Sequence, residues 1–306
     1  MKICLVGLGS VSAGYGFLDE HAPYCHVGGI LKTEHELSQV VEPSEENFQK
    51  AAAKWKFKAC KRVSFEEAEA DCFAIATPSG THFLLAQEIL LRKKCSLLVI
   101  EKPPAESIED ARALVRLAAE KGVEIRVSYT NGWSPELADC VKLVRNGELG
   151  KIVQVVGYGG GPVISHACHV TSMLFAFVSE RLDQFVISSG LERKGEGLEP
   201  FLRSLWAVYS RGEDECRISQ IGAKGPYGSN YVEVFGSEGW LRVGARVKAT
   251  GFARGKEMVF ERSKPESPFA ALYNPLSEEK SFFANWFRVF ELGMAACGGG
   301  RVKAFC

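Results

Sequence analysis

The sequence predicts an α/β fold in two parts: a parallel sheet covered by helices, then an α+β part with a large, mostly antiparallel open sheet. As far as about residue 125, apolar runs of strand length alternate with segments of helical periodicity. Strands that are apolar on both faces and interleaved with helices are typical of a parallel sheet. The later runs follow one another with few helices between them, which favours antiparallel pairing.

Apolar runs and helical periodicity define the expected elements of the first part. Five runs are expected to be strands: Lys2–Gly7, Glu36–Glu42, Asp71–Thr77, Ser96–Ile100 and Val123–Tyr129. Three segments between them are expected to be helices: Ser44–Trp55, Thr81–Leu91 and Ser107–Lys121. The last begins with Ser107 three residues ahead of Asp110, a spacing similar to a capping box. Ala13–Cys25 contains glycine and proline and is not expected to be a helix.

The second part contains mainly strand-like runs. Five strands are expected: Ile152–Tyr158, Gln184–Ser189, Phe201–Tyr209, Cys216–Gly222 and Tyr231–Phe235. A hairpin is expected at Phe235–Trp240, and helices at about His166–Val178 and Glu278–Met294. The sequence therefore predicts two domains, 1–124 and 125–306, with the last helix packing back on the first domain.

Composition and charge exclude several classes of protein. The 306 residues suit about two domains, and 37 basic residues balance 37 acidic ones. No basic surface indicates nucleic acid, and no apolar stretch approaches the roughly 20 residues that span a membrane. The ten cysteines include no C-x-x-C pair and often lie beside apolar runs, as core thiols do. With no recognisable signal peptide, we expect a reduced, cytoplasmic protein that acts on a small molecule, with neither a nucleic-acid nor a membrane partner.

A glycine-containing loop follows the first strand. Gly7 would permit a tight turn, and Gly9 would let the backbone approach a pyrophosphate at a helix start formed by Ser10 and Val11. Ser12 stands where the dinucleotide fingerprint of a Rossmann fold has Gly or Ala. The motif alone fits an ordinary turn equally well.

An acidic residue, Glu42, ends the second expected strand. Such a carboxylate can accept both ribose hydroxyls of NAD, and residues 43–48 contain no Lys or Arg for a 2′-phosphate. This pattern favours NAD over NADP. The spacing from Gly9 is longer than the roughly 20 residues usual in this fold, and the alternative is an exposed acid in a turn before Pro43.

Three further motifs carry a family resemblance. They are Ala76–His82 (ATPSGTH), Ile100–Pro103 (IEKP) and Asn146–Lys151 (NGELGK). With the glycine loop, they make most of the chain resemble the Gfo/Idh/MocA oxidoreductase family. The resemblance implies cofactor contacts at Thr77, Pro78, His82, Glu101 and Lys102. It also places Lys102 beside the nicotinamide and the reacting group, and it implies a cis bond between Lys102 and Pro103.

A second catalytic element of this family corresponds to Gly160–Ser172. His169 matches the family's catalytic histidine, while Ser165 and Ser172 replace its two aspartates. His169 could act as general base, and Lys102 could stabilise developing alkoxide charge. The resemblance and the flanking sequence give the substrate candidates Tyr129, Asn131, Trp133, Ser165 and His166.

The expected reaction is hydride transfer to or from a sugar, cyclitol or nucleotide sugar, with NAD as cofactor and no metal. One alternative is a glycosidase or lyase that uses transient oxidation by bound NAD. Another is a non-catalytic dinucleotide-binding protein, which the two missing aspartates favour. Lys102 could also be an exposed loop charge, and His169 a helix-start histidine bonded to the backbone. An uncovered apolar sheet face would need a partner, so we expect a homodimer or homotetramer.

Overall fold

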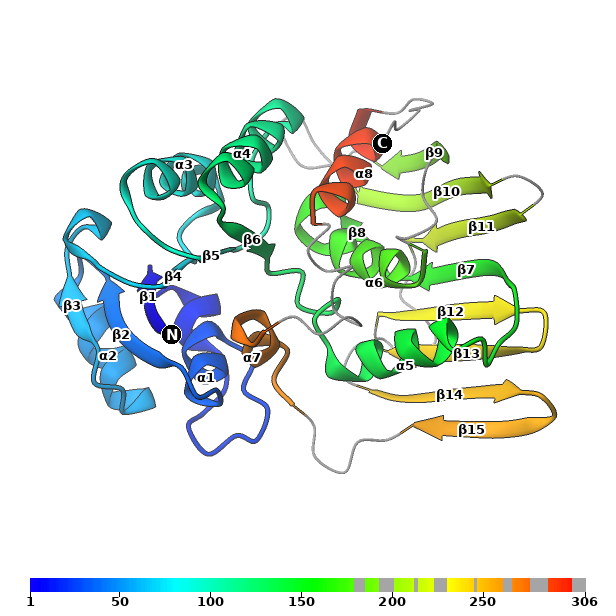
Figure 1. Ribbon diagram of the computed structural model, residues 1–306, viewed down its shortest axis with the longest axis horizontal. Coiled ribbons are helices and arrows are strands. Elements are labelled where there is room, and N and C mark those ends of the chain that lie inside the picture. Colours follow the sequence, from blue (N-terminus) through cyan, green and yellow to red (C-terminus); the bar gives the residue numbers. More distant parts are fainter. Residues whose placement is uncertain are drawn as a thin grey trace. The chain divides into compact units, whose positions relative to one another are not determined.

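The computed structural model describes residues 1–178, 185–192, 201–211, 214–222, 230–244, 247–260, 266–275 and 286–298 (Figure 1). The chain divides into two compact units: Met1–Trp133 with Lys264–Pro275, and Ser134–Ser263 with Leu276–Cys306. The boundary expected after residue 124 thus lies after Trp133. Among the described helices, none has the length and apolarity needed to cross a membrane.

A parallel sheet forms the centre of the first unit, as the sequence predicted. Its order is β3-β2-β1-β4-β5-β6, and its strands are β1 (Lys2–Val6), β2 (Glu36–Val41), β3 (Cys60–Arg62), β4 (Cys72–Ile75), β5 (Leu97–Ile100) and β6 (Glu124–Val127). The sequence did not predict β3, which has three residues and lies at the edge. The strand order reverses between β1 and β4, the place where sheets of this topology bind ligands.

Helices cover both faces of this sheet. On one side lie α1 (His26–Leu31) and α2 (Glu45–Trp55), and on the other α3 (His82–Arg92) and α4 (Ile108–Lys121) (Figure 1). Two short 3-10 turns precede neighbouring elements, η2 (Phe65–Glu67) and η3 (Ser79–Thr81). The Ser107 hydroxyl accepts a hydrogen bond from the Asp110 N–H at 3.1 Å, which confirms the predicted cap of α4.

The segment that links β1 to α1 is unusual for this fold. A five-residue π-helical turn, η1 (Ser10–Gly14), follows the glycine loop, and residues 15–25 then form turns rather than helix. Ala13–Cys25 was expected to contain no helix; this is confirmed for residues 15–25, whereas Ala13 and Gly14 belong to η1. The first crossover is therefore made by two short helical pieces instead of one long helix.

A late segment of the chain returns to the first unit. It contains α7 (Pro268–Tyr273), which packs on α1. The Ser267 hydroxyl donates to the Pro23 carbonyl at 2.5 Å, and the Arg126 guanidinium donates to the carbonyls of Leu272 and Asn274. The expectation that the last helix returns was wrong: α8 (Trp286–Gly298) belongs to the second unit, where it packs on α6.

The second unit contains a sheet of nine described strands, mostly antiparallel as predicted. They are β7 (Ile152–Tyr158), β8 (Gly161–Pro162), β9 (Phe185–Glu192), β10 (Phe201–Arg211), β11 (Asp214–Ile221), β12 (Tyr231–Gly236), β13 (Gly239–Gly244), β14 (Val247–Ala253) and β15 (Lys256–Phe260). Only the β7–β11 pair is parallel among the described pairs of this sheet. The hairpin predicted at Phe235–Trp240 joins β12 to β13.

Helices pack on one face of this second sheet. They are α5 (Pro135–Arg145), α6 (Cys168–Val178) and α8, and a π-helical turn, η4 (Val163–Ala167), precedes α6 (Figure 1). The sequence did not predict α5, although Ser134 and Pro135 are typical of a helix start. Part of the helix predicted at Glu278–Met294 lies outside the described residues. Among the described strands, β15 at one end of this sheet pairs with neither β8 nor β9 at the other, so the sheet is open as predicted.

Candidate functional site

The two glycines of the loop after β1 have different surroundings. Gly7 has a φ of 94°, and a Cβ there would lie 2.8 Å from the Ala76 carbonyl oxygen. Gly9 has an extended backbone, and beyond its chain neighbours no described atom lies within 4 Å of where its Cβ would be. Gly7 is therefore required by the packing of β1 against β4, whereas Gly9 borders open space that a ligand could fill.

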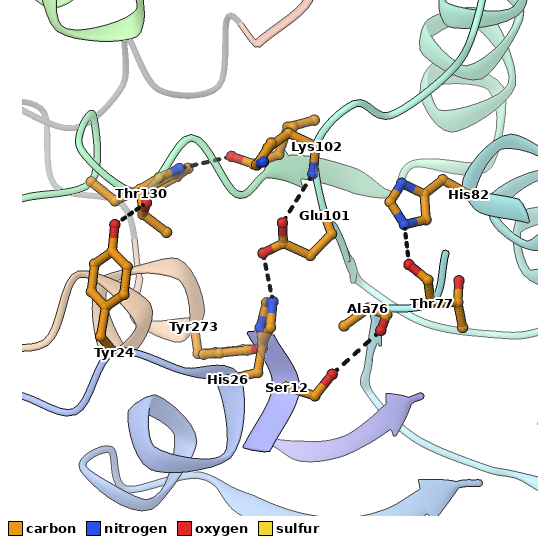
Figure 2. A network of polar contacts seen from close by, with 12 residues as sticks. Ser12, Tyr24, His26, Ala76, Thr77, His82, Glu101, Lys102, Thr130 and Tyr273 are labelled. Carbon is orange, nitrogen blue, oxygen red and sulfur yellow. Dashed lines mark hydrogen bonds and ion pairs between the residues drawn. The ribbon is translucent and has the colours of Figure 1, made fainter. Parts of the chain in front are cut away.

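Ser12, the departure from the fingerprint, is fully buried and joins the loop to β4. Its hydroxyl donates to the Ala76 carbonyl at 3.3 Å (Figure 2). The N–H groups of Ser12 and Ala13 bond back to the Gly9 carbonyl, each at 3.1 Å. The first N–H groups of such a turn have no partner within it, so Ser10 and Val11 can present theirs to an anion.

The Glu42 carboxylate is buried at the end of β2 and faces the loop. One oxygen accepts from the Leu8 N–H and the other from the Ser44 N–H, each at 3.0 Å. Glu42 is only 8% exposed, so it is not an exposed acid in the turn before Pro43. Each carboxylate oxygen has a second lone pair that could accept a ribose hydroxyl. The Glu42 carboxylate and the N–H groups of Ser10 and Val11 thus fit the ribose and the pyrophosphate of a dinucleotide.

His82 joins the loops that follow β4 and β5. The residue is 1% exposed, with Nδ1 2.7 Å from the Pro103 carbonyl and Nε2 2.8 Å from the Thr77 carbonyl (Figure 2). The Thr77 hydroxyl lies 2.7 Å from that of Thr81. Both ring nitrogens of His82 thus face the protein, and the residue positions the two loops. Its direct contact with a cofactor, like those of Thr77 and Pro78, stays a prediction.

Glu101 and Lys102 follow β5, and the peptide bond between Lys102 and Pro103 is cis, as the resemblance implied. The Glu101 carboxylate accepts from the Lys102 N–H at 3.2 Å and lies 3.0 Å from Nε2 of His26. The other ring nitrogen of His26 lies 2.5 Å from the Tyr273 hydroxyl (Figure 2). His26 and the Lys102 N–H thus hold the two oxygens of the buried carboxylate, and a cofactor contact by Glu101 stays a prediction.

Two pKa shifts accompany this arrangement. Burial raises the pKa of the Glu101 carboxyl. The hydrogen bond and charge of His26, with contributions from Ser128 and Lys102, lower it by more than burial raises it, so this pKa lies below its usual value. Burial raises the pKa of Tyr273 well above its usual value, and neighbouring acidic groups add to this. Glu101 is therefore ionised and Tyr273 is protonated at neutral pH.

The predicted substrate residues after β6 are largely buried. The exposed fractions are 4% for Tyr129, 9% for Asn131 and 1% for Trp133. The Trp133 indole N–H donates to the Val127 carbonyl at 2.9 Å, and the Arg126 guanidinium carbon lies 5.8 Å from its ring centroid. Trp133 therefore serves the core of this unit. Lys102, by contrast, is half-buried and is not simply an exposed loop charge.

The second unit holds the remaining predicted residues, in η4 and in the first turns of α6. Ser165 lies 3.0 Å from Nδ1 of its neighbour His166, which is exposed, while His169 is half-buried in the first turn of α6. The Ser172 hydroxyl donates to the His169 carbonyl at 2.7 Å and so does not replace an aspartate at the imidazole. Within the described ranges, no group of three potential metal ligands comes together.

Sequence reasoning missed one residue that organises this turn, Gln220 on β11. Its buried amide donates to the carbonyls of Gly159 and Ala167, each at 3.0 Å, and accepts from the Thr171 hydroxyl at 2.8 Å. The amide thus fixes η4 and the start of α6 against the sheet. A single glutamine in a strand-like run carries no sequence signal for this role.

Comparison with known proteins supports the fold of the first unit. Residues 1–129 match the oxidoreductase family with an NAD-binding Rossmann fold. A stretch of 150 residues, 48% of this chain, is 27% identical to the uncharacterized oxidoreductase YdgJ of Escherichia coli. The match spans only 41% of that relative's length.

Solved structures match over nearly the whole chain. One is the aldose-aldose oxidoreductase of Caulobacter crescentus complexed with glycerol, with a TM-score of 0.74, 15% identity and coverage of 99% of both chains. Another is an inositol dehydrogenase homolog of Azotobacter vinelandii complexed with NADH and myo-inositol, with a TM-score of 0.71 and 15% identity. It covers 100% of this chain and 97% of that one. A third is a super-repressor mutant of Gal80p from Saccharomyces cerevisiae, with a TM-score of 0.71 and 15% identity over 99% of this chain and 97% of that one. At these identities the likeness shows the fold.

Proposed function

The chain belongs, through its residues 1–129, to the Gfo/Idh/MocA oxidoreductase family, and from that premise we propose that it is an NAD-dependent oxidoreductase. Its substrate is a hydroxyl or carbonyl group of a sugar, cyclitol or nucleotide sugar. The observation that carries this proposal is the position of Lys102, which follows β5 with its N–H bonded to buried Glu101. NAD, when bound, would accept or donate the hydride, and the protein would orient and polarise the reacting group.

The first unit supplies the groups that would hold NAD. Open space beside Gly9 and the leading N–H groups of η1 suit a pyrophosphate, and the Glu42 carboxylate suits ribose hydroxyls. A 2′-phosphate would be repelled by the Glu42 carboxylate, which favours NAD over NADP.

Two side chains would carry the proton and charge steps. The Lys102 ammonium donates a hydrogen bond to the reacting oxygen and stabilises negative charge that develops on it. His169 takes the hydroxyl proton in oxidation and returns a proton in reduction. Position 172 holds a serine whose hydroxyl bonds to the His169 carbonyl, so no carboxylate orients the imidazole from that position.

A spectrophotometric screen at 340 nm tests this proposal. Polyols and sugars are offered with NAD⁺, and keto sugars with NADH, to the wild type, Lys102→Ala and Lys94→Ala. Lys94 is an exposed lysine, so Lys94→Ala controls for loss of charge. We expect Lys102→Ala to lower turnover roughly 10²- to 10⁴-fold while still binding NADH, because its role is in the chemical step. Unchanged turnover in Lys102→Ala would refute the assignment.

A non-catalytic dinucleotide-binding protein is the second candidate function. Ser165 and Ser172 at the two aspartate positions favour it, since neither supplies a carboxylate to His169. On this hypothesis, Lys102→Ala and His169→Ala would retain NADH binding and every cellular activity of the wild type. A redox-neutral glycosidase or lyase would instead consume a glycoside without accumulating NADH.

The main proposal also places the protein in the cytoplasm.

A further inference from the structure

We propose that His26 and Tyr273 are positioning residues for Lys102, acting through the Glu101 carboxylate. Glu101 in turn holds the main-chain N–H of Lys102. The inference rests on the proposed function, in which Lys102 is the catalytic lysine. It adds two residues that lie far from Lys102 in the sequence.

The three supporting side chains come from separate segments of the first unit. His26 begins α1, Glu101 follows β5, and Tyr273 ends α7. His26 and Tyr273 are 0% exposed and Glu101 is 5% exposed, so water does not compete for their hydrogen bonds. The distances are 2.5 Å from the Tyr273 hydroxyl to Nδ1, 3.0 Å from Nε2 to Glu101 and 3.2 Å from Glu101 to the Lys102 nitrogen.

The donors and acceptors of this chain are complementary. With a proton on Nε2, the His26 imidazole donates to Glu101, and its Nδ1 shares a hydrogen bond with the Tyr273 hydroxyl. The second carboxylate oxygen then accepts the Lys102 N–H. Removing the Tyr273 hydroxyl would leave Nδ1 of a buried imidazole without this partner, so the ring would no longer be held with Nε2 toward Glu101. Glu101 would then lose its fixed partner.

Packing prevents the imidazole from turning away. The Phe269 ring of α7 meets the His26 ring edge to face, with centroids 4.8 Å apart and planes at 76°. A Cβ at Gly29 would lie 2.5 Å from the Phe269 Cβ, so α1 and α7 approach as closely as the absence of a side chain allows. Both ends of the returning segment lead directly into the second unit. Within the first unit, α7 thus holds the His26 ring that contacts Glu101.

Tyr24, also in the first unit, provides a matched control for the Tyr273→Phe variant. The Tyr24 hydroxyl lies 2.6 Å from the Thr130 hydroxyl, and its ring meets Phe269 edge to face with centroids 5.2 Å apart. Tyr24→Phe removes a partly buried hydroxyl contact beside the same phenylalanine, away from Glu101. A general loosening of the α1–α7 packing would affect both tyrosine variants.

Hydrogen exchange of single backbone amides in the full chain tests the inference. We expect Tyr273→Phe and His26→Leu to raise the exchange rate of the Lys102 amide at least about tenfold, with Leu98–Ile100 unchanged. His26→Gln should partly restore protection because its amide can donate to Glu101, and Tyr24→Phe should leave the rate unchanged. Unchanged exchange at Lys102 in both disruptive variants, or an equal increase throughout β5, would overturn the proposal.

A measurement on the wild type covers the case in which a variant does not fold. Long-range ¹H–¹⁵N spectra of the His26 ring should show a proton on Nε2, and an Nε2 without a proton would overturn the proposal. Neither measurement needs substrate or cofactor. If the wild type binds no NADH, the proposed function fails while the hydrogen-bond chain is still decided. If NADH binds and a substrate is found, Tyr273→Phe should lower kcat and leave KM and the NADH Kd unchanged.

Discussion

The imidazole of His26 lies 3.0 Å from the carboxylate of Glu101 where both side chains are shielded from water. Burial alone would favour the neutral acid, but the His26 contact lowers the pKa of Glu101 below 4.5. In the unfolded chain the pKa returns to its usual value. The folded state therefore binds fewer protons between the two pKa values, and stability rises with pH across that window.

Replacing Glu101 by Gln should flatten the acid limb of the stability curve. The contribution of Glu101 is fully present above pH 4.5 and is lost as pH falls through its lower folded-state pKa. We expect the free energy of unfolding of Glu101→Gln, from urea titrations, to depend less on pH below 4.5. Glu106→Gln, at an exposed position, is the control. Parallel curves for Glu101→Gln and the wild type would contradict the ionised state of Glu101.

The two loop glycines should separate stability from binding. Gly7→Ala would place a Cβ 2.8 Å from the Ala76 oxygen at a φ of 94°, so it should cost about 1–3 kcal/mol of stability. Gly9→Ala should change stability by less than about 0.5 kcal/mol but weaken NADH binding at least tenfold, because its methyl group enters the proposed pyrophosphate space. Urea denaturation and NADH titration of both variants measure this. Undiminished NADH affinity in Gly9→Ala would argue against a ligand there.

Glu42 should determine both affinity and cofactor choice. Glu42→Ala removes the acceptor for the Leu8 N–H and the carboxylate proposed for the ribose, so the NADH Kd should rise about tenfold, or about 1.4 kcal/mol. The preference for NADH over NADPH should also shrink. Glu45→Ala, which removes an exposed acid from the first turn of α2, should leave both unchanged. Equal effects of the two substitutions would refute the role of Glu42.

One face of the second sheet carries aromatic and aliphatic side chains beside the charged pair Arg242 and Glu233. Trp240 and Phe252 pair across β13 and β14, and their exposed fractions are 37% and 40%. Val259 on β15, opposite Thr250, is on the same face and is 56% exposed. Neighbouring apolar side chains of this kind typically meet a partner. We therefore propose that this face joins copies of the chain into a homodimer or homotetramer.

Light scattering after size-exclusion chromatography tests this assembly. The wild type should have a mass of two or four times 33.5 kDa. The double variant Trp240→Lys/Phe252→Lys should dissociate because it buries like charges opposite one another. Leu84→Lys on α3, a side chain that is 60% exposed in the first unit, should not dissociate. A monomeric wild type would contradict the proposal.

The sequence predicted the elements whose periodicity is strong and missed those that depend on context. The strands β1, β4 and β5 are continuous apolar runs, whereas the edge strand β3 is short and polar. The glycine loop and Glu42 were identified from local motifs. The support of Lys102 was not, because His26 is 75 positions from Glu101 and 247 from Tyr273, and only the folded chain brings them together.

Calorimetric titration of the wild type with NADH and NADPH tests the central claim most directly. The buried Glu42 carboxylate, the open space at Gly9 and the support of Lys102 together predict one NADH site per chain. They also predict NADPH binding that is at least about tenfold weaker. A chain that binds neither dinucleotide, or that binds NADPH more tightly, would contradict this account.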